Sequence, residues 1–92
     1  MRYFKAALTQ LGKHNVAIIW LEKEMMNDEE EMKQHVLFYK KLLNCPNVAL
    51  MMLEDNEHPV YFGSKEIVDL LKLNHWKQFP WMSYSLEEHA GK

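Results

Sequence analysis

Two stretches of the chain are apolar at nearly every position. Residues 16–21 carry β-branched and aromatic side chains after a turn-like sequence at 12–15, and residues 47–53 are apolar from Val48 onward. A strand with one solvated face alternates apolar and polar residues, whereas a strand covered on both faces is apolar throughout. We therefore predict that both stretches are central strands of one sheet and that both of their faces are covered.

The segment between these strands has helical periodicity. Asn27 is a suitable N-cap, and the acidic residues 28–31 fall in the first turn, where the helix dipole favours negative charge. Asn44 and then Pro46 are residues that commonly end a helix. The apolar positions recur at spacings of four, three and four: Met32, Val36, Tyr39 and Leu43. This pattern predicts an amphipathic helix between Asn27 and Asn44.

A hairpin and a second helix are predicted after the second strand. The polar residues 55–58 indicate a turn, and residues 59–62 indicate a short returning strand. Pro59 cannot donate a ladder hydrogen bond, so it marks the start of that strand or a sheet edge. Ser64 is a suitable N-cap for a helix that ends near residues 73–74. The apolar face of this helix is formed by Ile67, Val68, Leu70 and Leu71.

The first residues of the chain fit two kinds of element. As a strand, residues 2–11 place Phe4, Ala6 and Leu8 on one face, and Gly12 begins the turn into the next strand. As a helix, they form an apolar stripe of Phe4, Leu8 and Leu11 that ends at Gly12. We favour the strand.

These elements predict an α+β fold in one domain over residues 1–86, followed by a frayed polar tail at 87–92. The predicted arrangement is a small two-layer sandwich in the order ββαββα, with a four-stranded sheet, two helices and an aromatic C-terminal segment. A helical N-terminus would give the order αβαββα, which over residues 28–73 resembles a thioredoxin-like domain without the CxxC motif. A C-terminal strand would give, from Val16 onward, the order βαββαβ, which resembles a ferredoxin-like domain. None of these topologies specifies a function.

The aromatic C-terminal segment, residues 75–84, reads HWKQFPWMSY. Two helices can cover one face of a small sheet, so the second face of the two apolar strands needs another cover. Each aromatic ring buries about 150–250 Å², so the four rings of this segment can supply that cover. The segment either folds back over its own sheet or meets a partner.

Composition limits the partners and the compartment. The net charge is −2, and no basic cluster is longer than the pair Lys40 and Lys41. Nucleic acids and anionic membranes both require a basic surface, so neither is expected as a partner. The chain has a single cysteine, no apolar run of about 18 residues and no apolar core of a signal peptide near its start. We expect a cytoplasmic protein.

No residue pattern points to catalysis or to a metal. Cys45 follows the C-terminal end of the first predicted helix, where the dipole opposes thiolate formation, so we interpret it as structural. The five histidines lack the short spacings of zinc ligands. The carboxylates cluster in segments that are expected to be solvated rather than in apolar sites. No cofactor is predicted, and an enzymatic activity is left unsupported.

Two functional hypotheses follow from the surplus of apolar surface. The first is a non-catalytic protein-interaction module that binds itself as a homodimer, or another protein, through an aromatic surface of Trp20, Trp76, Phe79, Trp81 and Tyr84. The alternative is a small-molecule-binding protein or enzyme whose apolar pocket is lined by these tryptophans together with Tyr39, His58, Tyr61 and His75. If the aromatic segment only completes the protein's own core, no surplus apolar surface remains to support either hypothesis.

Overall fold

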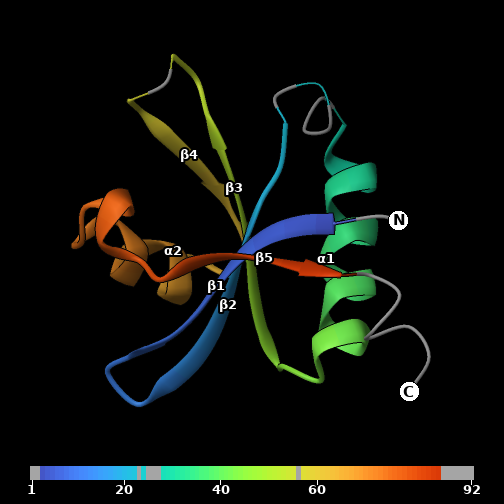
Figure 1. The fold of residues 1–92 in the computed structure, drawn as a ribbon, viewed down its shortest axis with the longest axis horizontal. Helices are drawn as coiled ribbons and strands as arrows, with labels where there is room; N and C mark the ends of the chain where they lie inside the picture. The colour runs from blue at the N-terminus through green and yellow to red at the C-terminus, as the bar shows by residue number, and fades with distance from the viewer. Residues whose placement is uncertain (1–2, 23, 25–27, 56, 86–92) are drawn as a thin grey trace.

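The described part of the chain forms a mixed five-stranded sheet with one α-helix on each face (Figure 1). The computed structural model describes residues 3–22, 24, 28–55 and 57–85, so Leu86 and the predicted tail at 87–92 lie outside the described residues. The elements in chain order are β1 (Tyr3–Leu11), β2 (His14–Trp20), α1 (Glu29–Leu43), β3 (Asn47–Leu53), β4 (Pro59–Phe62), α2 (Lys65–Lys72), the 3-10 helix η2 (Trp76–Gln78) and β5 (Trp81–Ser85).

The strands lie in the order β4-β3-β2-β1-β5. β2 and β3 are parallel and are joined through α1, whereas the pairs β1–β2, β3–β4 and β1–β5 are antiparallel. Leu11 pairs with His14, so only two residues turn β1 into β2. The first of them, Gly12, has φ 59, a conformation that a glycine adopts at little cost. This tight turn sets the register of the hairpin, and the strand predicted for residues 2–11 is confirmed over Tyr3–Leu11.

Both faces of the central strands are buried, as their sequences predict. Ile18 and Met51 are fully buried in the cluster that contains the apolar residues of α2. Ile19 and Leu50 are fully buried in the cluster that contains the apolar stripe of α1. Burial of a Leu, Ile or Met side chain stabilises a fold by about 1.5–3 kcal/mol, so these two clusters are the main source of stability.

The helix ends follow the expected chemistry with one change. The N-cap of α1 is Asp28, whose carboxylate accepts a hydrogen bond from the Glu30 amide at 2.9 Å, and not the predicted Asn27, which lies outside the described residues. Asn44 ends α1 in the left-handed conformation, and Ser64 caps α2 by accepting from the Ile67 amide at 3.4 Å. Within the described residues, neither helix has the length and apolar character needed to cross a bilayer.

The predicted strand count and layer arrangement are wrong. Residues Trp81–Ser85 pair with β1, so the sheet has five strands rather than four and the described order of strands and α-helices is ββαββαβ. α1 and α2 lie on opposite faces of the sheet, which gives three layers rather than a two-layer sandwich (Figure 1). The thioredoxin-like alternative is wrong because it requires a helical N-terminus. From β2 to β5 the order of the ferredoxin-like alternative is present, but β1 lies between β2 and β5 in the sheet.

Candidate functional site

The first part of the aromatic C-terminal segment, from Trp76 to Trp81, packs on the α2 side of its own sheet. Trp20 of β2 is at the centre, with ring centroids 5.3 Å from both Trp76 and Trp81. Phe79 lies 6.3 Å from Trp81. Trp76 and Phe79 are only 8% and 7% exposed. Four of the five residues predicted to form a contact surface therefore form part of the α2-side cluster of the monomer.

Local hydrogen bonds hold this segment in place. His75 caps η2, its ring nitrogen Nδ1 accepting from the Lys77 amide at 3.2 Å. The indole of Trp76 donates to the carbonyl oxygen of Glu57 at 3.3 Å, and the indole of Trp81 donates to the carbonyl oxygen of Trp76 at 2.8 Å. The indole N–H groups of the buried Trp76 and the half-buried Trp81 thus have acceptors, which lowers the cost of removing them from water.

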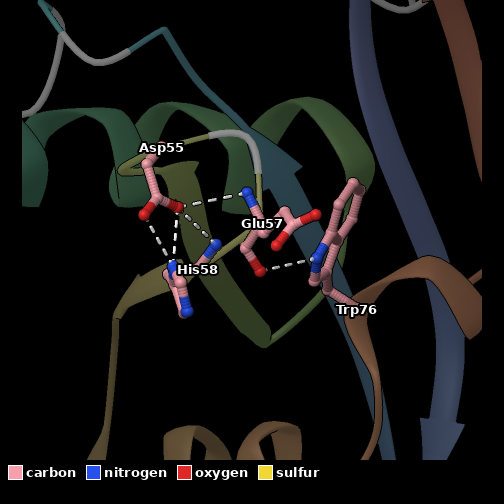
Figure 2. A network of polar contacts seen from close by, with 4 residues as sticks. All are labelled: Asp55, Glu57, His58 and Trp76. Atoms are coloured by element: carbon pink, nitrogen blue, oxygen red, sulfur yellow. Dashed lines mark hydrogen bonds and ion pairs between the residues drawn. The ribbon is translucent and has the colours of Figure 1, made fainter.

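The turn between β3 and β4 carries a polar network that contacts this segment (Figure 2). Nδ1 of His58 lies 2.7 and 2.8 Å from the two carboxylate oxygens of Asp55. The Asp55 carboxylate also accepts from the backbone amides of Glu57 and His58. The hydrogen bond between the two side chains lowers the pKa of Asp55 and raises the pKa of His58. Both side chains are exposed, so this network is a turn-stabilising feature rather than a buried catalytic pair.

The α1 side of the sheet carries a second group of aromatic rings. Phe4 of β1 lies 5.1 Å from Tyr39 and 5.6 Å from Tyr84 of β5, and Phe38 packs edge-on against Tyr39 at 5.0 Å. Burial raises the pKa of the Tyr39 hydroxyl. Tyr84, the fifth predicted contact residue, therefore lies on the opposite side of the sheet from the tryptophans.

The predicted pocket residues do not come together around one cavity. Tyr39 belongs to the α1-side cluster, whereas Tyr61 packs against the α2-side cluster. The hydroxyl of Tyr61 is buried without a hydrogen-bond partner in the described structure, and burial raises its pKa. His58 and His75 are exposed on the β3–β4 turn and at the start of η2. Only Tyr39 of these four lines the cleft described next.

A cleft of about 500 Å³ opens beyond the carboxyl ends of the parallel strands β2 and β3. Its lining combines aromatic, apolar and charged side chains: Tyr3, Phe4, Lys5, Trp20, Leu21, Glu22, Glu24, Tyr39, Leu53 and Ser83. The ammonium group of Lys5 lies over the Trp20 ring, 4.9 Å from its centroid. A volume of this size is in the range of small-molecule sites. The sequence pattern does not identify Lys5 or Glu22 as cleft residues, because charged residues are common at any solvated strand end.

A separate feature is the outer edge of β5. β5 pairs with β1 on one side and is the last strand of the described sheet. Its residues are Trp81, Met82, Ser83, Tyr84 and Ser85, none of them charged. On the α1 side of this edge, Met82 is 60% exposed and Leu8 of β1 is 45% exposed. Leu8 and Met82 were missed as surface residues because local periodicity does not show which part of a sheet face a helix leaves uncovered.

Metal and thiol chemistry find little support in the described residues. No group of three or more His, Cys, Asp or Glu side chains within them is placed to hold a metal ion. The Cys45 thiol lies 3.4 Å from the carbonyl oxygen of Asn47 and 3.6 Å from that of Asn15, between the end of α1 and the start of β3. This position suits a packed cysteine that links two elements.

No protein-family model, curated protein or solved structure matches this chain significantly, so its function has to be argued from its own geometry.

Proposed function

We propose that the protein is a non-catalytic interaction module that self-associates by pairing the β5 edge of one copy with the β5 edge of another. The observation that carries this proposal is the uncharged composition of the edge strand, residues Trp81–Ser85. The outermost strand of a sheet can add a strand from another chain through its backbone N–H and C=O groups. Natural edges are commonly protected by charge or proline, and β5 has neither.

The opposite edge of the sheet is protected in the usual way. β4 has four residues and begins with Pro59, which has no N–H to donate. The charged turn at 54–58 lies directly before it, with Asp55 and His58 exposed. Of the two edges, β5 is therefore the one suited to strand pairing.

The sequence of β5 allows it to pair with itself. An antiparallel pairing around a two-fold axis at Ser83 would place Met82 of one copy opposite Tyr84 of the other, and Trp81 opposite Ser85. Such an interface is isologous, which is the commonest way in which identical subunits associate. Cross-strand pairs of an apolar and an aromatic side chain contribute about 0.2–1 kcal/mol each, and the symmetry forms the Met82–Tyr84 pair twice.

Exposed apolar surface beside this edge supports the same pairing. Met82 and Leu8 lie on the α1 side of β5 and β1, where α1 is the only helix among the described residues. Exposed apolar surface next to an edge strand favours association, because burial of that surface adds to the backbone hydrogen bonds of strand pairing. Trp76 and Phe79 do not supply the contact surface in this proposal, because their rings are buried within the monomer.

The proposed compartment is the reducing cytoplasm, where one cysteine is compatible with a stable protein. The proposed interaction needs no cofactor. Another protein that offers a free strand could replace the second copy, and this possibility is an outcome of the test below.

The test is the solution mass by light scattering over a concentration series. We expect a mass that approaches twice the 11.0 kDa of one chain as concentration rises. Met82→Lys should keep the protein near 11.0 kDa, because it places a lysine in the centre of the paired edges. The matched control is Leu73→Lys directly after α2, where the leucine is 80% exposed and is not part of the β5 edge.

Either of two results would contradict the proposal. A mass of 11.0 kDa at all concentrations would exclude self-association and leave a hetero-partner as the only occupant of the edge. A dimer that Met82→Lys leaves intact would place the interface elsewhere. Circular dichroism should show both variants folded, because both leucine and methionine side chains are largely solvent-exposed.

A further inference from the structure

The cleft beyond the carboxyl ends of β2 and β3 is a second feature, and Ser83 is the one residue of its lining that belongs to the β5 edge proposed for self-association. Ligands of sheets with parallel strands bind beyond the carboxyl ends of those strands. In this protein β2 and β3 are the parallel pair, and the cleft is lined by Trp20 and Leu21 at the end of β2 and by Leu53 at the end of β3.

The walls of the cleft suit a flat apolar group. Trp20 comes from the α2 side of the sheet and Tyr39 from the α1 side, and Tyr3 and Phe4 of β1 also belong to the lining. Trp20 and Tyr39 are held by packing against other rings at 5.1–5.3 Å. A site of ordered aromatic side chains pays little conformational entropy on binding a planar ligand.

Two opposite charges face this cleft without neutralising each other. Lys5 contributes its ammonium group, held over Trp20 at 4.9 Å, and Glu22 contributes a carboxylate. Neither side chain forms an ion pair with any described residue. A ligand that carries a carboxylate and an ammonium group could pair with both, and charge-assisted hydrogen bonds of this kind are about twice as strong as neutral ones.

We infer that this cleft binds a small zwitterion with an aromatic body, of the chemical class of an aromatic α-amino acid. Lys5 receives the carboxylate, Glu22 receives the ammonium group, and the aromatic body lies among Trp20, Tyr39 and Tyr3. The hydroxyl of Ser83, whose residue pairs with Lys5 in the β1–β5 ladder, is a further hydrogen-bonding group of the lining. Polyphosphates are disfavoured, because Glu22 and Glu24 repel a multiply charged anion.

The experiment is a titration of the full chain with three related probes, followed by calorimetry and by amide chemical shifts. Phenylalanine carries both charges, 3-phenylpropionate lacks the ammonium group, and phenethylamine lacks the carboxylate. We expect saturable binding of phenylalanine, with shifts confined to the ends of β1, β2 and β3. Each truncated probe should bind about tenfold more weakly, the loss expected for one charge-assisted hydrogen bond.

Two variants test which cleft residue binds which charged group of the ligand. Lys5→Met should remove the preference for phenylalanine over phenethylamine, and Glu22→Gln should remove the preference for phenylalanine over 3-phenylpropionate. The control is Lys77→Met, because Lys77 lies 5.7 Å from the Trp76 ring in a similar cation–π contact but does not line the cleft. Lys77→Met should bind phenylalanine as the unmodified protein does.

Two outcomes would overturn the inference: no saturable shift with any probe, or 3-phenylpropionate binding as tightly as phenylalanine. The titration is repeated with Met82→Lys, which is designed to block strand pairing at β5. Binding that persists in Met82→Lys belongs to the single chain, so failure of self-association and failure of the ligand site can be told apart.

Discussion

On the α2 side of the sheet, an eight-residue helix is supplemented by the aromatic segment, which includes η2. Trp76 and Phe79 of that segment are 8% and 7% exposed. On the α1 side, a fifteen-residue helix packs without a comparable segment in the described structure. There Leu8 and Met82, on the half of the sheet formed by β1 and β5, remain 45% and 60% exposed.

This difference shows how a short chain completes a core. An aromatic ring buries about 150–250 Å², so a few rings on an irregular segment can cover as much sheet as an additional helix. Among the residues that the structure describes, such an aromatic cover is present on the α2 face only. The uncovered half of the other face lies next to β5, which is why the two sides are expected to respond differently to mutation.

The largest expected effect is the loss of the aromatic cover on the α2 side. Trp76→Ala removes a ring that packs 5.3 Å from Trp20 and an indole N–H that bonds to the Glu57 carbonyl. We expect the free energy of unfolding to fall by about 3–5 kcal/mol, the usual cost of truncating a buried aromatic residue. Chemical denaturation measures this change.

Gln78→Ala, at an exposed position of η2, is the control and should stay within about 0.5 kcal/mol of the unmodified protein. A loss below about 1 kcal/mol for Trp76→Ala would mean that the segment lies loosely on the sheet and does not complete the core.

A smaller effect is expected from the helix caps, one on each face. Ser64→Ala removes the acceptor for the Ile67 amide at the start of α2, and Asp28→Ala removes the acceptor for the Glu30 amide at the start of α1. Each should cost about 1 kcal/mol. Because α2 is short, only Ser64→Ala should also weaken the near-ultraviolet circular dichroism of the tryptophans. Equal loss of that signal in both variants would contradict the separation of the two faces.

Much of the fold follows from local patterns in the sequence. The two-sided apolar strands became β2 and β3, and the stripe Met32, Val36, Tyr39 and Leu43 became the packed side of α1. Asn44 and Ser64 act as the helix-ending and helix-starting residues that their chemistry predicts. These features are predictable because each depends on neighbours within a few residues.

The arrangement of the layers depended on information that local patterns do not contain. The strands β2 and β3 are apolar on both faces, so they do not specify which helix covers which face. β5 pairs with β1, although the two strands are separated by most of the sequence. The residues of β5 alternate between the two faces of the sheet without a clear apolar side and polar side. The cleft residues Lys5 and Glu22 are brought to one place only by the β1–β2 register and the strand ends.

The third prediction concerns the pH dependence of stability that the Asp55–His58 pair gives to the β3–β4 turn. The pKa of His58 is raised by its hydrogen bond to Asp55, and the pKa of Asp55 is lowered by the same bond. The His58 contribution is complete below the ordinary histidine pKa of about 6.5 and is lost as pH rises through its raised value. The Asp55 contribution is complete above the ordinary aspartate pKa of about 3.9 and is lost as pH falls through its lowered value.

The pair should therefore stabilise the turn most between about pH 4 and 6.5. His58→Gln should lower the melting temperature in this window and have little effect near pH 8.5. Asp55→Asn should remove the same pH dependence, and the double variant should add nothing to it. Because the Trp76 indole bonds to Glu57 of this turn, tryptophan fluorescence should follow the same profile. A His58→Gln effect that is constant with pH would exclude the ion pair as its cause.

The smallest change is expected for Phe38→Ala on the outer side of α1. Phe38 is 50% exposed, and its ring packs edge-on against Tyr39 at 5.0 Å. Loss of that contact costs about 0.5–1.5 kcal/mol, while alanine gains about 0.5 kcal/mol in helix propensity. The net change should be no more than about 1 kcal/mol.

The same substitution on the other face, Phe79→Ala, is the matched comparison and should cost about 3–5 kcal/mol, because Phe79 is 7% exposed. Both values come from urea denaturation at low protein concentration, where self-association does not contribute. A Phe38→Ala loss that approaches the Phe79→Ala loss would mean that the α1 side is covered as completely as the α2 side. That result would contradict the interpretation of Met82 and Leu8 as marking an uncovered half of the α1 face.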